Sequence, residues 1–320
     1  MSLDVMALAR LFHFAAIITR KTLVASTYAL ALLVCAPGVS LASGLVILYP
    51  EVRQPYARVY ADIIAGINET YPNTATAIVV STEESPANVQ KSVLSLQPDV
   101  LITLGEHNTR MAEKIAPNIP ILVGAVTSQD INRPGISMIP DGRLVIDKLL
   151  LLVPRSHTVH VVTNTANKSL QMALAEEYAA SKRVALVVHS ASTVQAAAVE
   201  YKKLLDHIGE GEAIWLMQDK ALNDPTLLSQ ILETAWRKRI AVFSSNPTHV
   251  KRGALFAIYP NNKTLGRSLG KLAVQHKMNR EIPQNIMPLR DLNTVVNGRT
   301  SRHLGVTISR DMLSQFDNIL

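Results

Sequence analysis

The stretch from Ala213 to Asn261 reads AIWLMQDKALNDPTLLSQILETAWRKRIAVFSSNPTHVKRGALFAIYPN and decides the fold. Three apolar runs, Ala213–Met217, Ile240–Phe243 and Gly253–Tyr259, each end in polar or turn-forming residues. Between the first two runs, aliphatic residues recur at the spacings of three and four that are typical of a helix, namely Leu227, Leu228, Ile231, Leu232 and Ala235. A strand, a polar loop, a helix and a strand in this order predict a βαβ unit of a parallel sheet that is buried on both faces.

The same alternation of apolar runs and helical patterns fills the chain before this unit. It begins with a strand at Leu45–Tyr49 and restarts near Pro154 with a second set of units. We therefore expect an α/β fold with two doubly wound, Rossmann-like lobes, a ligand cleft between them, and hinges near Pro154 and Pro260. The expected segments are a leader at 1–43, a first lobe at 44–154 joined by part of 260–320, a second lobe at 155–259, and a C-terminal segment at 260–320 that returns across the hinge.

The composition agrees with a globular α/β protein. The chain has 320 residues, of which 48% are hydrophobic, 18% are charged and 5% are aromatic, so it is long enough for two cores. The formal net charge is +7, but the basic residues beyond the leader are dispersed. Since no basic stripe with interleaved aromatic residues is present, we do not expect nucleic-acid binding.

Residues 1–43 have the pattern of a targeting segment. The basic pair Arg20-Lys21 precedes a mostly apolar run, Thr22–Ala36, and the triplet Ser40-Leu41-Ala42 places small residues where signal peptidase cleaves. We expect cleavage after this triplet and export to the periplasm. Two other outcomes stay open, namely retention of the segment as a membrane anchor and attachment of a lipid at Cys35, the only cysteine in the chain.

The residues that carry metal or cofactor chemistry form no recognisable set. His157 and His160 lie three apart on an expected strand and therefore face opposite sides of the sheet. The histidines further along are scattered and fit no ligand spacing, namely His189, His207, His249, His276 and His303. We expect no metal site and no cofactor.

The sequence also lacks a catalytic set. Glu106 and His107 are adjacent at a loop–helix junction, so their side chains are expected to point apart. The run Gly266–Lys271 partly matches a phosphate-binding loop, but it is one residue short and continues into Leu272, which favours a helix with a surface lysine. There is no nucleophile elbow. We therefore do not expect an enzyme.

Several short motifs resemble one family in their order along the chain. They are Asp99–Gly105, Ile119–Val123, Leu222–Pro225, Gly253–Leu255 with Leu265–Arg267, and the ending Ile282-Pro283, Asn297 and Leu304–Ile308. Together they resemble the substrate-binding proteins of bacterial ABC transporters with a type 1 periplasmic-binding fold, and most closely the group that binds tryptophan or related small solutes. The resemblance covers most of Leu45–Leu320. The chain departs from the pattern at Tyr259-Pro260-Asn261, where the family often has glycine, and it is short between the first helix and the strand at Ala77.

The resemblance implies that both lobes contribute residues at strand ends to a bound solute. The first lobe would contribute Tyr49, Gln54, Glu106, His107, Asn108, Thr109 and Thr127. The second lobe would contribute Thr163, Asn164, Gln218, Asp219, Asn223, Ser245, Asn246 and Tyr259.

The expected roles of these residues follow from their chemistry. Backbone amides after Gly105 and Thr165, at helix starts, would hold a carboxylate. Asp219 or Glu106 would face an ammonium group. The asparagines have an alternative role as helix caps, namely Asn108, Asn164 and Asn223.

The expected function is that of an extracytoplasmic solute-binding protein that acts as a monomer. It would capture a small polar molecule such as an amino acid and deliver it to a membrane ABC permease. A ligand-sensing lobe for a membrane signalling partner and a two-lobed transferase remain as alternatives. A transcriptional regulator of the same fold would need a helix-turn-helix before the first lobe, and residues 1–43 are too apolar for one.

Overall fold

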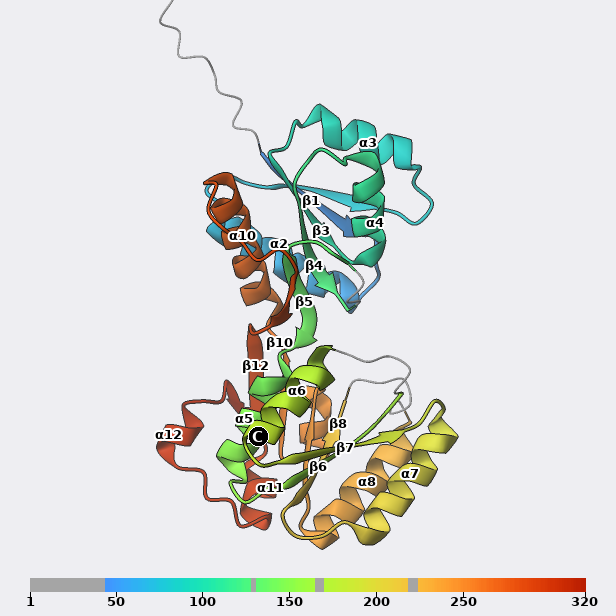
Figure 1. The fold of residues 1–320 in the computed structure, drawn as a ribbon, viewed down its shortest axis with the longest axis vertical. Helices are drawn as coiled ribbons and strands as arrows, with labels where there is room; N and C mark the ends of the chain where they lie inside the picture. The colour runs from blue at the N-terminus through green and yellow to red at the C-terminus, as the bar shows by residue number, and fades with distance from the viewer. Residues whose placement is uncertain (1–43, 128–130, 165–169, 218–223) are drawn as a thin grey trace, which may run out of the picture. The chain divides into compact units, whose positions relative to one another are not determined.

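A computed structural model of the chain describes residues 44–127, 131–164, 170–217 and 224–320. These residues form two sheets, each covered by helices on both faces (Figure 1). The first sheet has six strands in the order β11-β5-β4-β3-β1-β2. Its strands are β1 (Leu45–Pro50), β2 (Thr76–Val80), β3 (Val100–Leu104), β4 (Ile121–Val126), β5 (Gly135–Pro140) and β11 (Ile286–Leu289), and all neighbours pair in parallel.

The helices of the first lobe divide between the two faces of this sheet. Helices α2 (Tyr56–Thr70) and α10 (Asn262–Lys277) cover one face, while α3 (Pro86–Ser95) and α4 (Glu106–Ile115) cover the other (Figure 1). Strand β1 shows why its sequence is apolar throughout: Ile47 packs in the core under α2 and α10, and Leu48 packs in the core under α3 and α4. A strand that is buried on both faces has no polar side to alternate with.

The second sheet has seven strands in the order β13-β12-β10-β9-β8-β6-β7. They are β6 (Thr158–Thr163), β7 (Ala185–Ser190), β8 (Glu212–Leu216), β9 (Ala241–Ser244), β10 (Phe256–Pro260), β12 (Leu292–Val296) and β13 (Asn318–Ile319). All neighbours pair in parallel except β10 and β12, which are antiparallel. The predicted βαβ unit is confirmed, since β8 and β9 are adjacent parallel strands and α8 (Pro225–Lys238) connects them.

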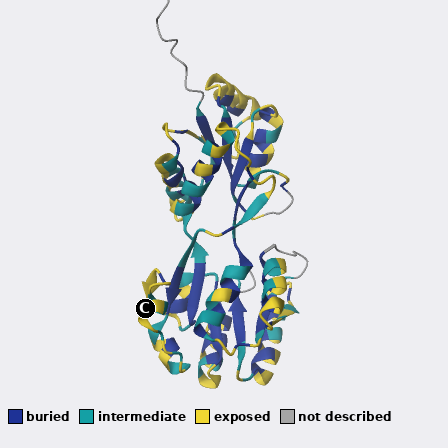
Figure 2. Ribbon diagram, turned by 60° about the vertical axis from the view of Figure 1, so that its left-hand side comes forward, coloured by how far each residue is buried: buried dark blue, intermediate teal, exposed yellow. Residues whose placement is uncertain are grey.

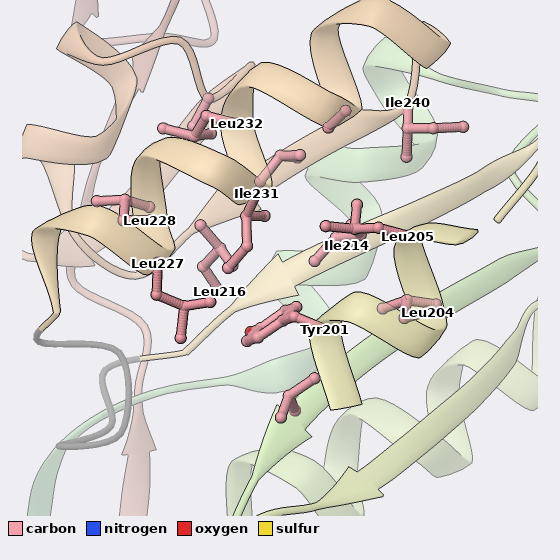
Figure 3. Close-up of a cluster of buried hydrophobic side chains, with 14 of the residues drawn as sticks. Tyr201, Leu204, Leu205, Ile214, Leu216, Leu227, Leu228, Ile231, Leu232 and Ile240 are labelled. Carbon is pink, nitrogen blue, oxygen red and sulfur yellow. The ribbon is translucent and has the colours of Figure 1, made fainter. Parts of the chain in front are cut away.

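Helices again cover both faces of the second sheet. Figure 3 shows the core on one face, where α7 (Val194–His207) and α8 bury Tyr201, Leu228 and Ile231 against the strands. On the other face lie α5 (Gly142–Leu152) and α6 (Leu170–Ser181), over a row of aromatic rings. Trp215 and Phe243 stack with ring centroids 5.8 Å apart, and Phe243 stacks on Phe256 at 5.0 Å. The remaining helices are short, namely α9 (Pro247–Lys251), α11 (Gly298–His303) and α12 (Arg310–Leu313). The strands are mostly buried and the outer helix faces exposed, as Figure 2 shows.

The chain passes between the two sheets three times, from β5 to α5, from β10 to α10, and from β11 to β12. The three crossings are hydrogen-bonded to one another. The backbone N–H of Asp141 donates to the carbonyl of Leu289 at 2.8 Å, and that of Asn261 donates to the carbonyl of Asp291 at 2.9 Å. One crossing lies at Pro260, between β10 and α10. Another follows Pro140 rather than Pro154, because α5 packs in the core of the second sheet.

The run Gly266–Lys271 lies inside α10, which agrees with the helix expected there. Its glycine has a packing role. A methyl group on Gly266 would clash with the carbonyl oxygen of Ile63 in α2, so glycine allows the two helix backbones to approach closely. Among the described residues, no helix is both long enough and apolar enough to cross a membrane.

Candidate functional site

In the first lobe, the ends of β3 and β4 are joined by two residues that the sequence analysis selected. Glu106 begins α4 directly after β3, and Thr127 follows β4. The Glu106 carboxylate oxygen Oε1 accepts hydrogen bonds from the Thr127 backbone N–H at 3.3 Å and from its hydroxyl at 3.1 Å. Because the carboxyl ends of parallel strands are where ligands bind in such sheets, this bridge lies at the expected edge.

The start of α4 has a glycine in place of a capping side chain. Gly105 occupies the N-cap position with φ of +88°, a conformation that favours glycine, and it can offer no side chain to accept from the first-turn N–H groups. No side chain of the described residues caps this helix. The helix dipole and the first-turn N–H groups therefore favour a negatively charged group at this end.

Asn108 and Thr109 point into the lobe. The Asn108 side chain is only 1% exposed, and its amide nitrogen donates to the Leu104 carbonyl at 3.1 Å. Its Oδ1 is buried without a hydrogen-bond partner among the described residues, so Asn108 does not cap α4. The fully buried Thr109 hydroxyl is bonded to the Gly105 carbonyl at 3.0 Å and to the Thr103 hydroxyl at 2.9 Å, so its polar group is satisfied inside the lobe.

The other selected residues of the first lobe are less constrained. Tyr49 is half-buried near the end of β1 and packs against the core beneath α2 and α10. Gln54, in the loop after β1, and His107, in the first turn of α4, are exposed. Their contact with a solute stays a prediction.

In the second lobe, Asn246 is a helix cap. Its Oδ1 accepts hydrogen bonds from the Thr248 backbone N–H at 2.9 Å and from the Thr248 hydroxyl at 2.8 Å, which starts the short helix α9. The neighbouring Ser245 is half-buried, and its N–H donates to the Leu216 carbonyl at 3.1 Å. These contacts fix the loop after β9.

A buried network that the sequence analysis missed lies under the same loop. The Ser244 hydroxyl donates to the Leu216 carbonyl at 3.1 Å and accepts from the Asn246 N–H at 3.0 Å. It also lies 2.8 Å from Nδ1 of His249, and since the hydroxyl proton is already donated, that nitrogen is the donor. Burial lowers the pKa of His249, and the charge of Arg252 lowers it further.

Thr163 and Asn164 are half-buried at the end of β6, and Tyr259 is half-buried near the end of β10. Burial raises the pKa of Tyr259, and the charge of Asp317 acts in the same direction, so the phenol is a neutral hydrogen-bonding group. Other predicted residues lie outside the described part of the chain, namely Gln218, Asp219 and Asn223, together with Thr165.

A buried carboxylate at the crossings was also missed. The Asp141 side chain is fully buried. Its carboxylate oxygen Oδ2 lies 2.7 Å from Nη2 of Arg143 and 3.6 Å from Nη1 of Arg290. Burial alone would raise the pKa of Asp141, but the hydrogen bonds and charge of Arg143, with the charge of Arg290, outweigh it and lower the pKa. Sequence patterns contain no signal for this cluster, because Arg290 reaches Asp141 only through the fold.

The histidines are less scattered than their spacing suggests. His160 on β6 and His189 on β7 touch, with Nδ1 of the first 3.1 Å from Nε2 of the second. They line a cavity of about 360 Å³, and His207 lines the same cavity. No group of three or more His, Cys, Asp or Glu side chains in the described segments is arranged to hold a metal ion.

Two helix-covered, largely parallel sheets joined by three crossings have the architecture of a type 1 periplasmic binding protein. The chain matches the profile of the ABC transporter substrate binding protein family over residues 73–319, and it belongs to that family. A comparison with curated protein sequences gave no match.

Solved structures share the fold at low sequence identity. The ligand-free, open structure of a substrate-binding protein with adhesive properties from Clostridium difficile is 17% identical, with a TM-score of 0.63, over 86% of this chain and 98% of that one. An ABC domain in complex with L-Trp from Streptococcus pneumonia is 16% identical, with a TM-score of 0.53, over 87% and 100%. A LacI family transcriptional regulator from Bifidobacterium animalis is 13% identical, with a TM-score of 0.50, over 78% and 95%. Because a transcriptional regulator is among them, these likenesses establish the fold alone.

Proposed function

We propose that the protein is an extracytoplasmic solute-binding protein that captures a small polar molecule, an amino acid or a similar solute, and delivers it to an ABC permease. Membership of the substrate-binding family supports a small-molecule ligand and a transporter partner. The family is not a class of enzymes, and in this proposal the solute leaves chemically unchanged.

The observation that carries the proposal is the edge of the first sheet at α4. Its uncapped first turn offers backbone N–H groups to an anion, and the Glu106 carboxylate lies in the same turn. Glu106 already accepts from Thr127 through Oε1. A carboxylate accepts several hydrogen bonds at once, so in this proposal an ammonium group of the solute shares the Glu106 carboxylate with Thr127. A donor set for a carboxylate beside an acceptor for an ammonium suits a zwitterion.

The second lobe would complete the site through the polar residues after its strands. Thr163, Asn164 and Tyr259 stand at strand ends there and are half-buried. A solute that contacts both lobes stabilises the closed state, so binding shifts the population toward closure. The three crossings are the segments at which such a motion would be absorbed.

The identity of the solute is proposed only as a class. The Streptococcus structure is a complex with L-Trp, but at 16% identity that ligand is not carried over to this chain. We propose that residues 1–43 direct export to the periplasm, with cleavage after Ala42, and that the protein acts as a monomer without a cofactor or nucleic acid.

Thermal unfolding of the purified protein, with amino acids, purines, sugars and short peptides as separate additions, tests this function. A solute at 100 times its Kd adds about 2.7 kcal/mol to the free energy of unfolding. We expect an amino acid or a compound of similar size and charge to raise the unfolding temperature. If no compound in any class does so, the proposed function is wrong.

A matched pair of variants then tests the site. Glu106→Gln removes the carboxylate charge from the first turn of α4 and should abolish the solute-dependent rise. Glu113→Gln removes a charge from the same helix, at a residue that pairs with Arg133 at 2.9 Å. This variant should keep the solute-dependent rise in unfolding temperature. An equal response of the two variants would place the solute elsewhere.

A further inference from the structure

Two imidazole rings on adjacent strands of the second sheet face each other. Strands β6 and β7 pair in parallel, with Val162 opposite His189. Since residues two apart share a face of a strand, the side chain of His160 lies on the same face as that of His189. Their ring centroids are 5.3 Å apart, and Nδ1 of His160 is 3.1 Å from Nε2 of His189.

Each ring has a carboxylate near its other nitrogen. Oε1 of Glu212, the first residue of β8, lies 3.6 Å from Nε2 of His160. Oε2 of Glu200, on α7, lies 3.9 Å from Nδ1 of His189. Neither distance is that of a hydrogen bond, so each carboxylate would move closer to its ring to orient it as a metal ligand.

We propose that His160 and His189 together bind one divalent transition-metal ion such as Zn²⁺, through the two nitrogens that face each other. With Zn–N bonds of about 2.0–2.1 Å in a tetrahedral arrangement, two ligating nitrogens lie roughly 3.3 Å apart. The observed separation of 3.1 Å therefore needs only a small opening of the pair.

The cavity beside the two histidines provides space for the other metal ligands and a charge that suits a cation. Its volume of about 360 Å³ leaves room for water molecules as the other ligands. Such ligands are needed because the described residues offer no group of three or more protein ligands. Glu200, Glu212 and Lys203 line the cavity, and Lys203 pairs with Glu200 at 2.8 Å, so the Glu212 carboxylate leaves a net negative charge that favours a cation. This makes an exchangeable site rather than a closed structural one.

A hydrogen bond between the two rings accounts for the same distance without a metal, and titration separates the two explanations. The experiment is calorimetric titration of ZnCl₂ into the purified, chelator-treated protein. We expect one ion per chain, with Mg²⁺ and Ca²⁺ giving no heat, because imidazole ligands suit Zn²⁺ and not the hard cations. Co²⁺ bound at the same site should give visible absorption bands, a readout that is independent of heat.

Variants assign the ligands. His160→Gln and His189→Gln should each abolish the binding, and Glu200→Gln and Glu212→Gln should each weaken it about 10- to 100-fold. His157→Gln is the control, since that exposed histidine precedes the same strand and does not line the cavity. His189, whose side chain is 23% exposed on an edge strand, is the safer replacement for folding. Circular dichroism verifies that each variant is folded.

The proposal is overturned if the wild-type protein takes up no Zn²⁺, or if folded His189→Gln binds it as tightly as the wild type. Neither result depends on the solute, because none of the residues that line this cavity is among those proposed to bind the solute.

Discussion

Gly66 in α2 and Gly266 in α10 face each other so closely that a methyl group on either would lie 3.0 Å from the α-carbon of the other. The same methyl groups would clash with the backbone carbonyls of Lys263 and Ile63, respectively. A helix from the C-terminal part of the chain is thereby packed against the first helix of the first lobe.

Gly266→Ala should lower the free energy of unfolding by about 1–3 kcal/mol, because the added methyl forces the helices apart. Helix propensity alone predicts the opposite sign, a gain of about 1 kcal/mol. Urea unfolding at neutral pH measures the change. Gly209→Ala is the control, since a methyl there meets no atom within 4 Å. Stabilisation by Gly266→Ala would show that the helices do not touch in solution as they do here.

Asp141→Asn should cost about 1.5–3 kcal/mol at neutral pH, because it removes charge-assisted hydrogen bonds to a buried carboxylate. Folding lowers the pKa of Asp141 below its ordinary value of 3.8, so the unfolded chain binds the proton more tightly. The contribution of the Asp141 carboxylate to the free energy of unfolding is therefore complete well above pH 3.8. It is lost as the pH falls through the pKa of the folded state.

Urea unfolding of wild type and Asp141→Asn across an acid series should give curves of stability against pH that converge at low pH. Asp62→Asn is the control, because its carboxylate is 44% exposed and lies 3.9 Å from Arg58. An exposed pair of this kind contributes at most about 1 kcal/mol. Equal losses in the two variants would contradict the role given to Asp141.

His249→Gln should remove part of the acid sensitivity of the protein. Burial holds the pKa of His249 below the ordinary 6.5, so between that value and its folded pKa the unfolded chain binds more protons. Stability from the neutral, buried ring is thus complete above the ordinary value and declines as the pH falls below it. The measurement is urea unfolding of both proteins from pH 8 to pH 5. Parallel curves would mean that His249 does not titrate in the expected way.

Two variants of Asn246 distinguish a helix-capping role from contact with the solute. Asn246→Ala should lower the free energy of unfolding by about 1 kcal/mol, the ordinary cost of losing an N-cap. Asn246→Asp keeps an oxygen acceptor for Thr248 and should retain the stability. If Asn246 is only a cap, the aspartate variant should also keep the solute-dependent rise in unfolding temperature. Loss of that rise with unchanged stability would make Asn246 a ligand residue.

The sequence was sufficient for elements whose residues signal their own structure. The run Ala213–Met217 predicts a strand because it is apolar on both faces, and α8 follows from helical spacing with Asp224-Pro225 at its start. Strand β5 is missed, since Gly135 and Pro140 bound a short segment that reads as loop. Asp141 at its end is missed with it.

The site residues also divide into those that local sequence predicts and those that only the fold brings together. Glu106 and Thr127 each follow an apolar run, so the sequence placed both at one sheet edge, although their hydrogen bond could not be foreseen. His160 and His189 meet only through the register of β6 and β7. Spacing along the chain carries no information on that register, so the two histidines look unrelated in the sequence.

The three crossings also govern how the chain is completed during synthesis. Helix α10 and strand β11 belong to the first lobe, and β12 and β13 to the second, yet all four follow Pro260. A nascent polypeptide that has emerged only as far as Pro260 therefore lacks one of the two helices on one face of the first sheet, and it lacks an edge strand on both sheets. Neither lobe can be cut out as one continuous fragment with its core intact.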